Sequence, residues 1–314
     1  MLVFVCSLLS IPFLIIALII PESPRWLFTK NKEKQAMKTT NFMARINKVK
    51  LSEGIWEEAK KAGIEIQQKL SSAKRYSSLD LFRQKTMALL TLNVMFSWFV
   101  NSFVYYGVSL NAGALAGDIF INNTLNGVME IASYLLVMIL LDRIGRRIIL
   151  ASFFAVAGIV LICSVIVNTY AEDNQSMVTL GLAFAFIGKI GISGAFGVIY
   201  NYTSELYATV IRSNGVGVGS MASRVGGFTA PYVISLQDYI PWLPNAIFGV
   251  FAIAAALSAL AFPETNGQPM LETLDEANDF YKNWKASNAS VDVKVRVKSS
   301  AHDNRAYDRE STKL

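Results

Sequence analysis

Two positive side chains and one carboxylate lie inside long apolar stretches of this 314-residue chain: Arg224, Lys189 and Glu130. A charge at the depth of a bilayer costs several kcal/mol unless it faces water, a ligand or an opposite charge. These residues therefore indicate a ligand pathway through a membrane protein. A structural ion pair is the alternative for Glu130, and snorkelling of the side chain to the surface is the alternative for Lys189.

Aromatic and amide side chains accompany the charges at helical spacing, on two helix faces: Trp98, Asn101 and Tyr105, and Asn126, Glu130 and Tyr134. Residues at i, i+3, i+4, i+7 and i+8 share one side of a helix. Such a face suits a cavity that receives an organic cation by cation–π contact. The alternative is an aromatic belt at the membrane interface, which would also account for Tyr106.

The elements that would position these residues are membrane helices. Hydrophobic residues make up 53% of the chain and charged residues only 17%, too apolar a composition for an ordinary soluble domain. About 20 apolar residues span a bilayer as a helix, because lipid offers the backbone no other hydrogen-bond partner. Such runs cover residues 1–20, 86–108, 118–141, 148–168, 178–204, 213–236 and 243–262. We therefore predict an all-α membrane protein with about seven transmembrane helices.

The polar segments define the predicted organisation around these helices. Residues 1–20 form a transmembrane helix, for which a signal peptide is the alternative, and residues 86–262 form a six-helix bundle. Residues 21–85 are basic and form a cytoplasmic loop with short helices by the positive-inside tendency. Residues 263–314 form a largely disordered cytoplasmic tail. The net charge of +6 arises mostly between the spans, so we expect no nucleic-acid partner.

Charged turns would lie together on the cytoplasmic side. Alternation from a cytoplasmic loop at 21–85 puts the segments 142–147, 205–212 and 263–269 on the same side. Their charged residues are candidates for a gate latch in an alternating-access carrier: Asp142, Arg143, Arg146, Arg147, Glu205 and Arg212. Simple topological anchoring is the alternative interpretation.

Enzyme chemistry has little support in the sequence. The two cysteines, Cys6 and Cys163, lie in apolar runs, and the only histidine, His302, lies in the polar tail. No metal site, cofactor site or nucleophile–base pair is apparent from this composition. We expect a protein that is not an enzyme and that needs no cofactor.

Several motifs carry a family resemblance: PESPRWL at 21–27, WFVNSFVYYGVSLN at 98–111, DRIGRR at 142–147, ELYATVIR at 205–212, SNGVGVGSMASRVGG at 213–227 and PETNGQPMLETLDEA at 263–277. On these, the chain resembles the organic cation, anion and carnitine transporter family of the major facilitator superfamily. That resemblance implies twelve spans in two six-helix halves with the substrate between them. Residues 1–20 would be the sixth span, and the other six spans would be the C-terminal half. We expect a truncated gene model or isoform, since five spans and a large extracellular loop have no counterpart here.

The resemblance also implies a subfamily. Cation carriers tend to have an acid where Arg224 stands, and anion carriers tend to have a lysine where Tyr134 stands. Arginine without that lysine, together with Glu130, resembles the zwitterion and carnitine type. Arg224 would bind the substrate carboxylate, and an aromatic and polar wall would hold its ammonium end, with the lumen's charge set by Glu130 and Lys189. The residues of that wall are Trp98, Asn101, Tyr105 and Tyr134.

The predicted function is transport of small organic cations or zwitterions such as carnitine by a multi-pass protein of the plasma membrane. The coupling ion stays open. One alternative is a sugar-type major facilitator symporter, which would need more lumen-facing carboxamides than Asn101 and Asn126. The other is a non-transporting fragment that only associates with partners in the membrane.

Overall fold

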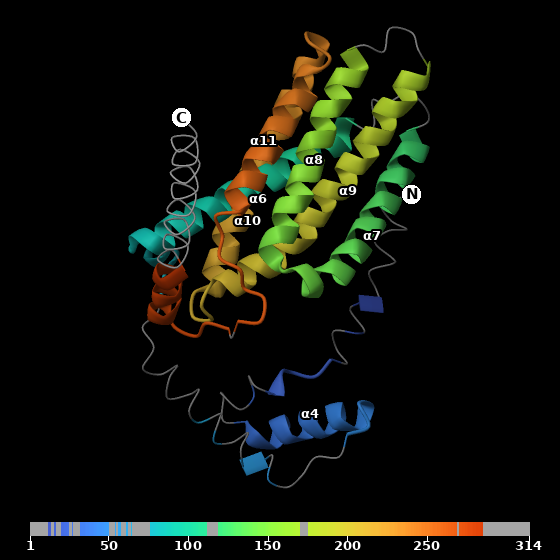
Figure 1. Cartoon of the computed structure of the whole chain (residues 1–314). Coiled ribbons are helices and arrows are strands. Elements are labelled where there is room, and N and C mark those ends of the chain that lie inside the picture. Colours follow the sequence, from blue (N-terminus) through green and yellow to red (C-terminus); the bar gives the residue numbers. More distant parts are fainter. Residues whose placement is uncertain are drawn as a thin grey trace, which may run out of the picture. The chain divides into compact units, whose positions relative to one another are not determined.

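The computed structural model describes residues 12–13, 16, 20–24, 27, 32–49, 54, 56–57, 61, 64, 76–111, 119–169, 175–268 and 270–284. The predicted helix over residues 1–20 lies almost wholly outside them. The chain divides into two units, residues 1–75 and 76–314, and each is described by itself. The elements of the described ranges are all helical, in agreement with the predicted all-α class (Figure 1).

Among its described residues, the first unit has the helix α4 over Glu33–Ile46. Glu33 lies in its first turn and Arg45 in its last, the arrangement that the helix dipole favours. Ala36 and Thr39 are its buried residues. This helix is one of the short helices predicted for the loop at 21–85.

The second unit begins with a short 3-10 helix, η1, over Ser78–Phe82, whose start is fixed by a capping box between Ser77 and Asp80. Six long helices and one more 3-10 turn follow: α6 (Lys85–Asn111), α7 (Ile119–Ile144), α8 (Arg146–Thr169), α9 (Gln175–Leu206), α10 (Arg212–Ile234), η3 (Ser235–Asp238) and α11 (Leu243–Ala259). The predicted apolar runs between residues 86 and 262 each coincide with one of the six helices.

Four of these helices are long and apolar enough to cross a membrane: α6, α7, α8 and α9. The helix α10 falls outside this group because glycine, serine and two arginines lower its hydropathy. The helix α11 has 17 residues and is apolar throughout. The apolar side chains that cover much of α7, including Phe120, Ile131 and Met138, are exposed, as expected for a surface that faces lipid.

Glycines set the closest helix contacts. A Cβ on Gly226 of α10 would collide with the backbone oxygen of Phe99 on α6. A Cβ on Gly191 of α9 would lie 2.9 Å from the backbone nitrogen of Ala157 on α8. Small residues at these crossings allow the backbones to approach, which is how membrane helices gain packing energy. The pairs α6–α10 and α8–α9 therefore form the tightly packed frame of the bundle.

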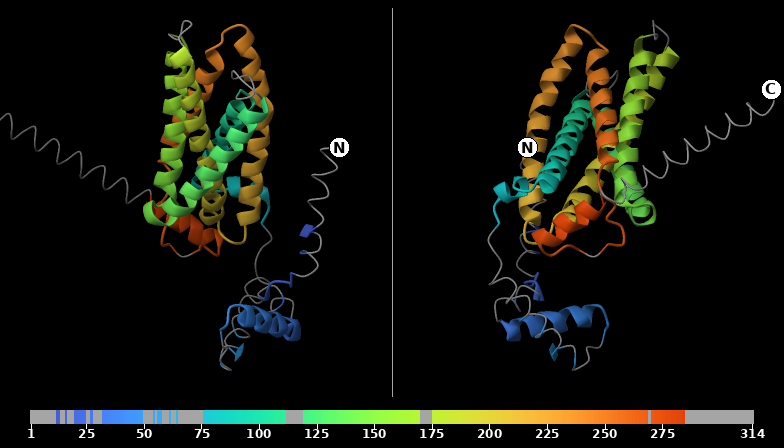
Figure 2. Two further views of the ribbon diagram at one scale, coloured as in Figure 1. Left: turned by 90° about the vertical axis from the view of Figure 1, so that its right-hand side faces the viewer. Right: turned by 60° about the vertical axis from the view of Figure 1, so that its left-hand side comes forward.

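The segment after α11 differs from the predicted disordered tail. Residues 274–284 are helical, and Leu274, Ala277 and Tyr281 are buried on one face at i, i+3 and i+7. Figure 2 shows this helix, drawn in red, lying across the end of the bundle where α8 begins and α9 ends. The expectation of disorder is therefore wrong for residues 274–284, because a short apolar period is enough when a packing surface is nearby. Residues 285–314 lie outside the described residues.

Candidate functional site

An open hollow of about 250 Å³ lies among α6, α7, α9 and α10. Its lining is aromatic and charged: Ser102, Tyr105, Tyr106, Glu130, Tyr134, Phe196, Tyr200, Ser223 and Arg224. Four of the predicted binding residues are in this set, namely Tyr105, Glu130, Tyr134 and Arg224. The hollow thus combines a carboxylate, a guanidinium and several aromatic rings in one place.

The carboxylate of Glu130 is held by two tyrosines. The hydroxyl of Tyr105 lies 2.9 Å from Glu130 Oε2 and 3.1 Å from Oε1. The hydroxyl of Tyr134, one helical turn further along α7, donates to Glu130 Oε1 at 3.0 Å. Two phenol donors fix the orientation of this carboxylate. The hollow therefore presents a negative group framed by aromatic rings, an arrangement suited to an organic cation.

Lys189 lies behind this site and does not line the hollow. Its side chain is 2% exposed, and its Nζ donates to Ser109 Oγ at 2.6 Å. The same ammonium group lies 3.5 Å from the ring centroid of Tyr105. Tyr105 therefore stands between two charges, with its ring toward Lys189 and its hydroxyl on Glu130. Lys189 thus contacts a residue that lines the hollow but does not line the hollow itself, unlike the lumen-facing place predicted for it.

Trp98 and Asn101 are completely buried between helices. The indole Nε1 of Trp98 donates to Thr203 Oγ1 at 2.9 Å, and its ring packs edge-on against Tyr200 at 4.4 Å between centroids. Neither amide atom of Asn101 has a hydrogen-bond partner. Neither residue lines the hollow, so the structure does not place Trp98 and Asn101 at the predicted lumen-facing positions. For Trp98 the reason is that Thr203 and Tyr200 of α9 cover its ring.

Arg224 is exposed in the hollow, on the α10 side. Within the described ranges it forms no ion pair, so no protein carboxylate occupies its guanidinium. A free guanidinium presents a planar set of donors that matches a carboxylate. Arg224 is therefore available to the anionic end of a ligand.

The sequence interpretation missed several residues of the hollow: Ser102, Phe196, Tyr200 and Ser223. Phe196 and Tyr200 are stacked at 5.9 Å, one turn apart on α9. Two aromatic side chains at i, i+4 in a run otherwise rich in glycine and alanine are a usable signal for a lined face. No signal in the sequence distinguishes the two serines.

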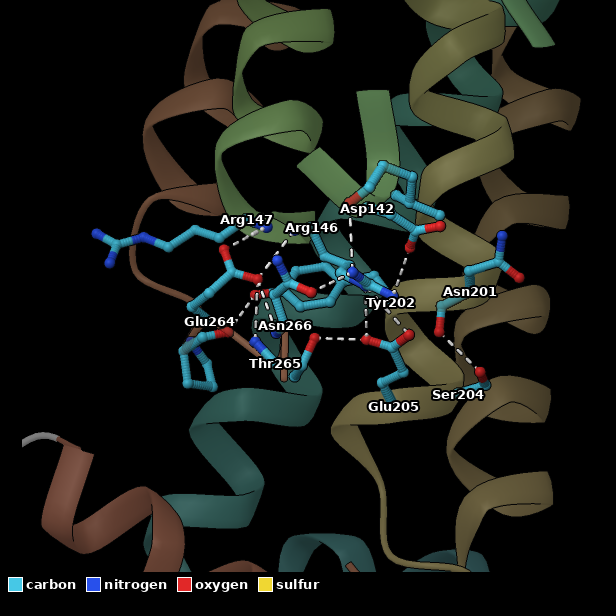
Figure 3. A network of polar contacts seen from close by, with 12 residues as sticks. Asp142, Arg146, Arg147, Asn201, Tyr202, Ser204, Glu205, Glu264, Thr265 and Asn266 are labelled. Carbon is cyan, nitrogen blue, oxygen red and sulfur yellow. Dashed lines mark hydrogen bonds and ion pairs between the residues drawn. The ribbon is translucent and has the colours of Figure 1, made fainter. Parts of the chain in front are cut away.

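A second polar cluster lies at the end of the bundle where α8 begins (Figure 3). The Arg146 side chain forms ion pairs with Glu205, at 3.2 Å between Nε and Oε2, and with Asp142 at 3.3 Å. It also donates to Asn266 Oδ1 at 2.7 Å. The structure thus brings together Asp142, Arg146 and Glu205, three of the residues predicted for a gate.

Glu264 anchors the same cluster from beyond α11. Its carboxylate accepts hydrogen bonds from the backbone N–H groups of Arg146 at 2.9 Å and Arg147 at 3.1 Å. A carboxylate at a helix N-terminus satisfies unpaired donors and the positive end of the dipole. Gly145 makes the approach possible, since its φ is +102° and a Cβ there would lie 2.8 Å from Glu264 Oε2. The conformation and the contact both require glycine.

The segment from Pro263 to Tyr281 ties further helix ends together. Thr265 Oγ1 donates to Glu205 Oε2 at 2.6 Å, the Tyr202 hydroxyl donates to the Pro263 carbonyl, and the Tyr281 hydroxyl donates to the Leu206 carbonyl. Burial raises the pKa of the Tyr281 hydroxyl well above its ordinary value, so this group stays protonated as a donor. Apart from Glu205, the sequence interpretation did not select these residues.

The remaining predicted gate residues lie outside the cluster. Arg147 contributes its backbone, while its guanidinium lies 5.5 Å from the ring of Trp284. Arg212 donates to Thr209 Oγ1 at 3.2 Å, and Arg143 is exposed. Among the described residues neither Arg143 nor Arg212 forms an ion pair. Both therefore stand apart from the latch that was predicted for them.

The comparisons with known proteins give the family. Residues 1–277 match the sugar (and other) transporter family, and the chain belongs to it. Members of this family are transporters and not enzymes. With its apolar helices, the chain is an integral membrane protein.

Similar curated proteins include organic cation carriers. The chain is 37% identical over 267 residues to the organic cation transporter protein of Drosophila melanogaster, covering 84% of this chain and 48% of that protein. It is 35% identical over 273 residues to solute carrier family 22 member 16 of Xenopus laevis, covering 87% and 47%. It is 34% identical over 278 residues to solute carrier family 22 member 4 of Mus musculus, covering 87% and 48%. The predicted resemblance is confirmed, and the chain spans about half the length of these relatives.

Solved structures show the fold. The major facilitator proton:xylose symporter XylE bound to 6-bromo-6-deoxy-D-glucose is similar with a TM-score of 0.54 and 22% identity, over 87% of this chain and 57% of that one. The inward open form of the xylose transporter XylE from E. coli is similar with a TM-score of 0.52 and 19% identity, over 86% and 54%. The predicted fold class, part of a major facilitator fold, is confirmed.

Proposed function

We propose that this chain forms the C-terminal half of a membrane carrier that moves small organic cations or zwitterions, such as carnitine, by alternating access. The observation that carries the proposal is that Glu130 and Arg224 both line one hollow that is also lined by aromatic rings. A zwitterion needs both a negative and a positive group from its site, with apolar surface between them. The name of the Drosophila melanogaster relative supports the class of substrate.

The cationic end of the substrate binds at Glu130. Its carboxylate is oriented by Tyr105 and Tyr134, and the ring of Tyr200 lines the same hollow. A quaternary ammonium group has no N–H donors and cannot replace these hydrogen bonds, so it binds by charge and by cation–π contact. The two tyrosine hydroxyls consequently stay on the carboxylate when the ligand is bound.

The anionic end of the substrate binds at Arg224. This side chain has no protein partner among the described residues, and the hydroxyls of Ser102 and Ser223 line the same hollow. A carboxylate that accepts two parallel hydrogen bonds from the guanidinium would gain both charge and geometry. A simple cation has no anionic group that a guanidinium could bind. The presence of Arg224 therefore favours a zwitterion as the substrate.

The other half of the cavity comes from elsewhere. The hollow is open, and the chain matches about half the length of its relatives. We assign residues 86–262 to the C-terminal six-helix bundle and residues 1–20 to the preceding span. Residues 21–85 and 263–314 lie on the cytoplasmic side of the plasma membrane. The coupling ion is left open.

The cluster around Arg146 is the cytoplasmic gate of this half. Arg146 joins the start of α8 to Glu205 near the end of α9. Glu264 and Thr265 join the start of α8 and Glu205, respectively, to the segment after α11. A network with several ion pairs has discrete arrangements, so its rupture is a suitable step between two carrier conformations. Turnover, rather than substrate affinity, depends on it.

The test compares uptake of labelled carnitine and of tetraethylammonium by cells that express two forms. One form is this chain, and the other, called the extended form below, carries an N-terminal six-span half ahead of Met1. For the experiment, that half is taken from coding sequence upstream of Met1 or from one of the relatives. The proposal expects uptake of carnitine by the extended form only. Absence of uptake by both forms would support a non-transporting fragment, and uptake by this chain alone would contradict the two-half arrangement.

A sugar symporter is not favoured by the site. The residues that line the hollow include a carboxylate, a guanidinium and four tyrosines, but neither asparagine nor glutamine. Neutral sugars are bound mainly by hydrogen bonds from such polar side chains, and unpaired charges in the lumen would go unused. Competition of the labelled cation by excess xylose tests this alternative, and we expect none.

A further inference from the structure

The helix α4 combines a basic stripe with an apolar stripe on neighbouring faces. Lys34, Lys38 and Arg45 are spaced i, i+4 and i+11, so they share one side of the helix. Phe42 and Ile46 share the adjacent side. All five side chains are exposed, and Phe42 and Ile46 are 48% and 63% exposed. The structure thus leaves large apolar groups in water beside a row of positive charges.

A hollow of about 420 Å³ opens on the same part of the helix. Lys38 and Phe42 line it, with Pro21, Glu22 and Leu27 on the opposite wall. In the sequence, Pro21 directly follows the apolar run at 1–20. Twelve residues, 21–32, separate that apolar run from the start of α4 at Glu33.

We propose that α4 lies on the anionic lipid surface of the membrane that holds the transport helices. Its apolar stripe enters the boundary between headgroups and acyl chains, and its basic stripe reaches the phosphate and carboxylate groups of anionic lipids. Each Lys or Arg held near such a surface raises membrane binding about fivefold. The long Lys and Arg stems allow the charges to stay at headgroup level while the helix body sits lower.

The apolar stripe distinguishes lipid from another polyanion. Nucleic acid would engage the three cations but would leave Phe42 and Ile46 in water. A lipid surface accepts both stripes at once. The helix also needs only weak affinity of its own, because the rest of the chain already anchors it close to the bilayer.

The test measures amide hydrogen exchange of residues 33–46 in the full chain, reconstituted in nanodiscs. One set contains phosphatidylcholine alone, and the other contains about a third phosphatidylserine. We expect exchange to be at least fivefold slower with phosphatidylserine. Raising the salt from about 0.1 M to about 0.5 M should remove most of that difference, because the Debye length falls.

Two variants and one control test the separate contributions of the basic stripe and the apolar stripe. Replacing Lys34, Lys38 and Arg45 by Gln keeps helix propensity and should abolish the effect of phosphatidylserine. The matched control replaces the exposed residues Lys61, Arg83 and Lys282 by Gln and should keep the effect. The pair Phe42→Gln and Ile46→Gln should weaken protection in phosphatidylserine while the cations remain.

Three outcomes overturn the proposal. The first is equal exchange in the two lipids, which would place α4 on the protein itself or in water. The second is an effect of phosphatidylserine that survives neutralisation of the three cations. The third is an effect of phosphatidylserine that does not respond to salt. The salt test uses the unchanged protein, so its result does not depend on whether a variant folds.

Discussion

Tyr105 binds Glu130 through its hydroxyl, at 2.9 Å, while the face of its ring receives the buried Lys189 ammonium at 3.5 Å. One side chain thus links the two charges on either side of it. The arrangement keeps the carboxylate of Glu130 on the open side of α6 and the ammonium of Lys189 in the packed interior. Under the proposed function the negative group would therefore meet the substrate, although a positive group lies close to it.

Neutralising Glu130 tests this division of roles. In the extended form, Glu130→Gln keeps one acceptor oxygen, which at the Oε1 position is within reach of both tyrosines, but loses the charge that binds a cation. We expect affinity for tetraethylammonium to fall by tenfold or more, or by at least about 1.4 kcal/mol. The control is Asp238→Asn, an exposed carboxylate after α10, for which uptake should be unchanged. An unchanged KM for Glu130→Gln would remove Glu130 from the site.

The latch around Arg146 makes a kinetic prediction. Arg146→Ala removes the ion pairs with Glu205 and Asp142 and the hydrogen bond to Asn266. We expect the maximal uptake rate of the extended form to change several-fold while KM changes less than twofold. The matched control is Arg143→Ala, which removes an exposed arginine three residues away. If the two variants behaved alike, the Arg146 network would have no special part in gating.

Glu264 makes a prediction about stability. Glu264→Ala leaves the first N–H groups of α8 without their acceptor, which costs about 1–2 kcal/mol for a lost helix cap. We expect a lower melting temperature of the purified chain in detergent. Asp275→Ala, which removes an exposed carboxylate of the same tail, is the control and should melt like the unchanged chain. Equal melting of both variants would show that the cap contributes nothing.

The glycines of α10 offer a matched pair. Gly226→Ala puts a methyl group against the backbone of Phe99, and overpacking of this kind costs about 1–3 kcal/mol. Gly217→Ala on the same helix meets nothing within 4 Å and gains helix propensity. Thermal melting should therefore fall for the first variant and hold or rise for the second. The reverse order would contradict the packing of α6 against α10.

The sequence predicted the helices well because each apolar run is long and ends at charged or turn-forming residues. It also placed Glu130 and Tyr134 together correctly, since both lie on one helix and spacing alone relates them. It failed for Trp98 and Asn101, because spacing defines a face but not the helix that covers it. Trp98 is covered by Thr203 and Tyr200 of α9, which is distant in the sequence.

The sequence analysis also did not predict the long-range polar contacts. Glu264 reaches the start of α8 across more than a hundred residues, and nothing local marks it as a helix cap. Arg143 and Arg147 flank Arg146 in the same turn, yet only Arg146 reaches Glu205. Arg143 belongs to α7, whereas Arg146 and Arg147 begin α8. Which arginine reaches Glu205 depends on how the helices pack, and sequence spacing does not identify the packing partners.

The most direct test of the central claim is uptake by the extended form carrying Arg224→Ala. The account assigns Arg224 to the substrate carboxylate and Glu130 to the cation, so the two ends of a zwitterion should separate. We predict that uptake of carnitine falls tenfold or more, while uptake of tetraethylammonium, which has no carboxylate, stays within twofold. Arg224→Lys, which keeps the charge but not the planar donors, should fall between the two. Undiminished carnitine uptake after Arg224→Ala would contradict the account.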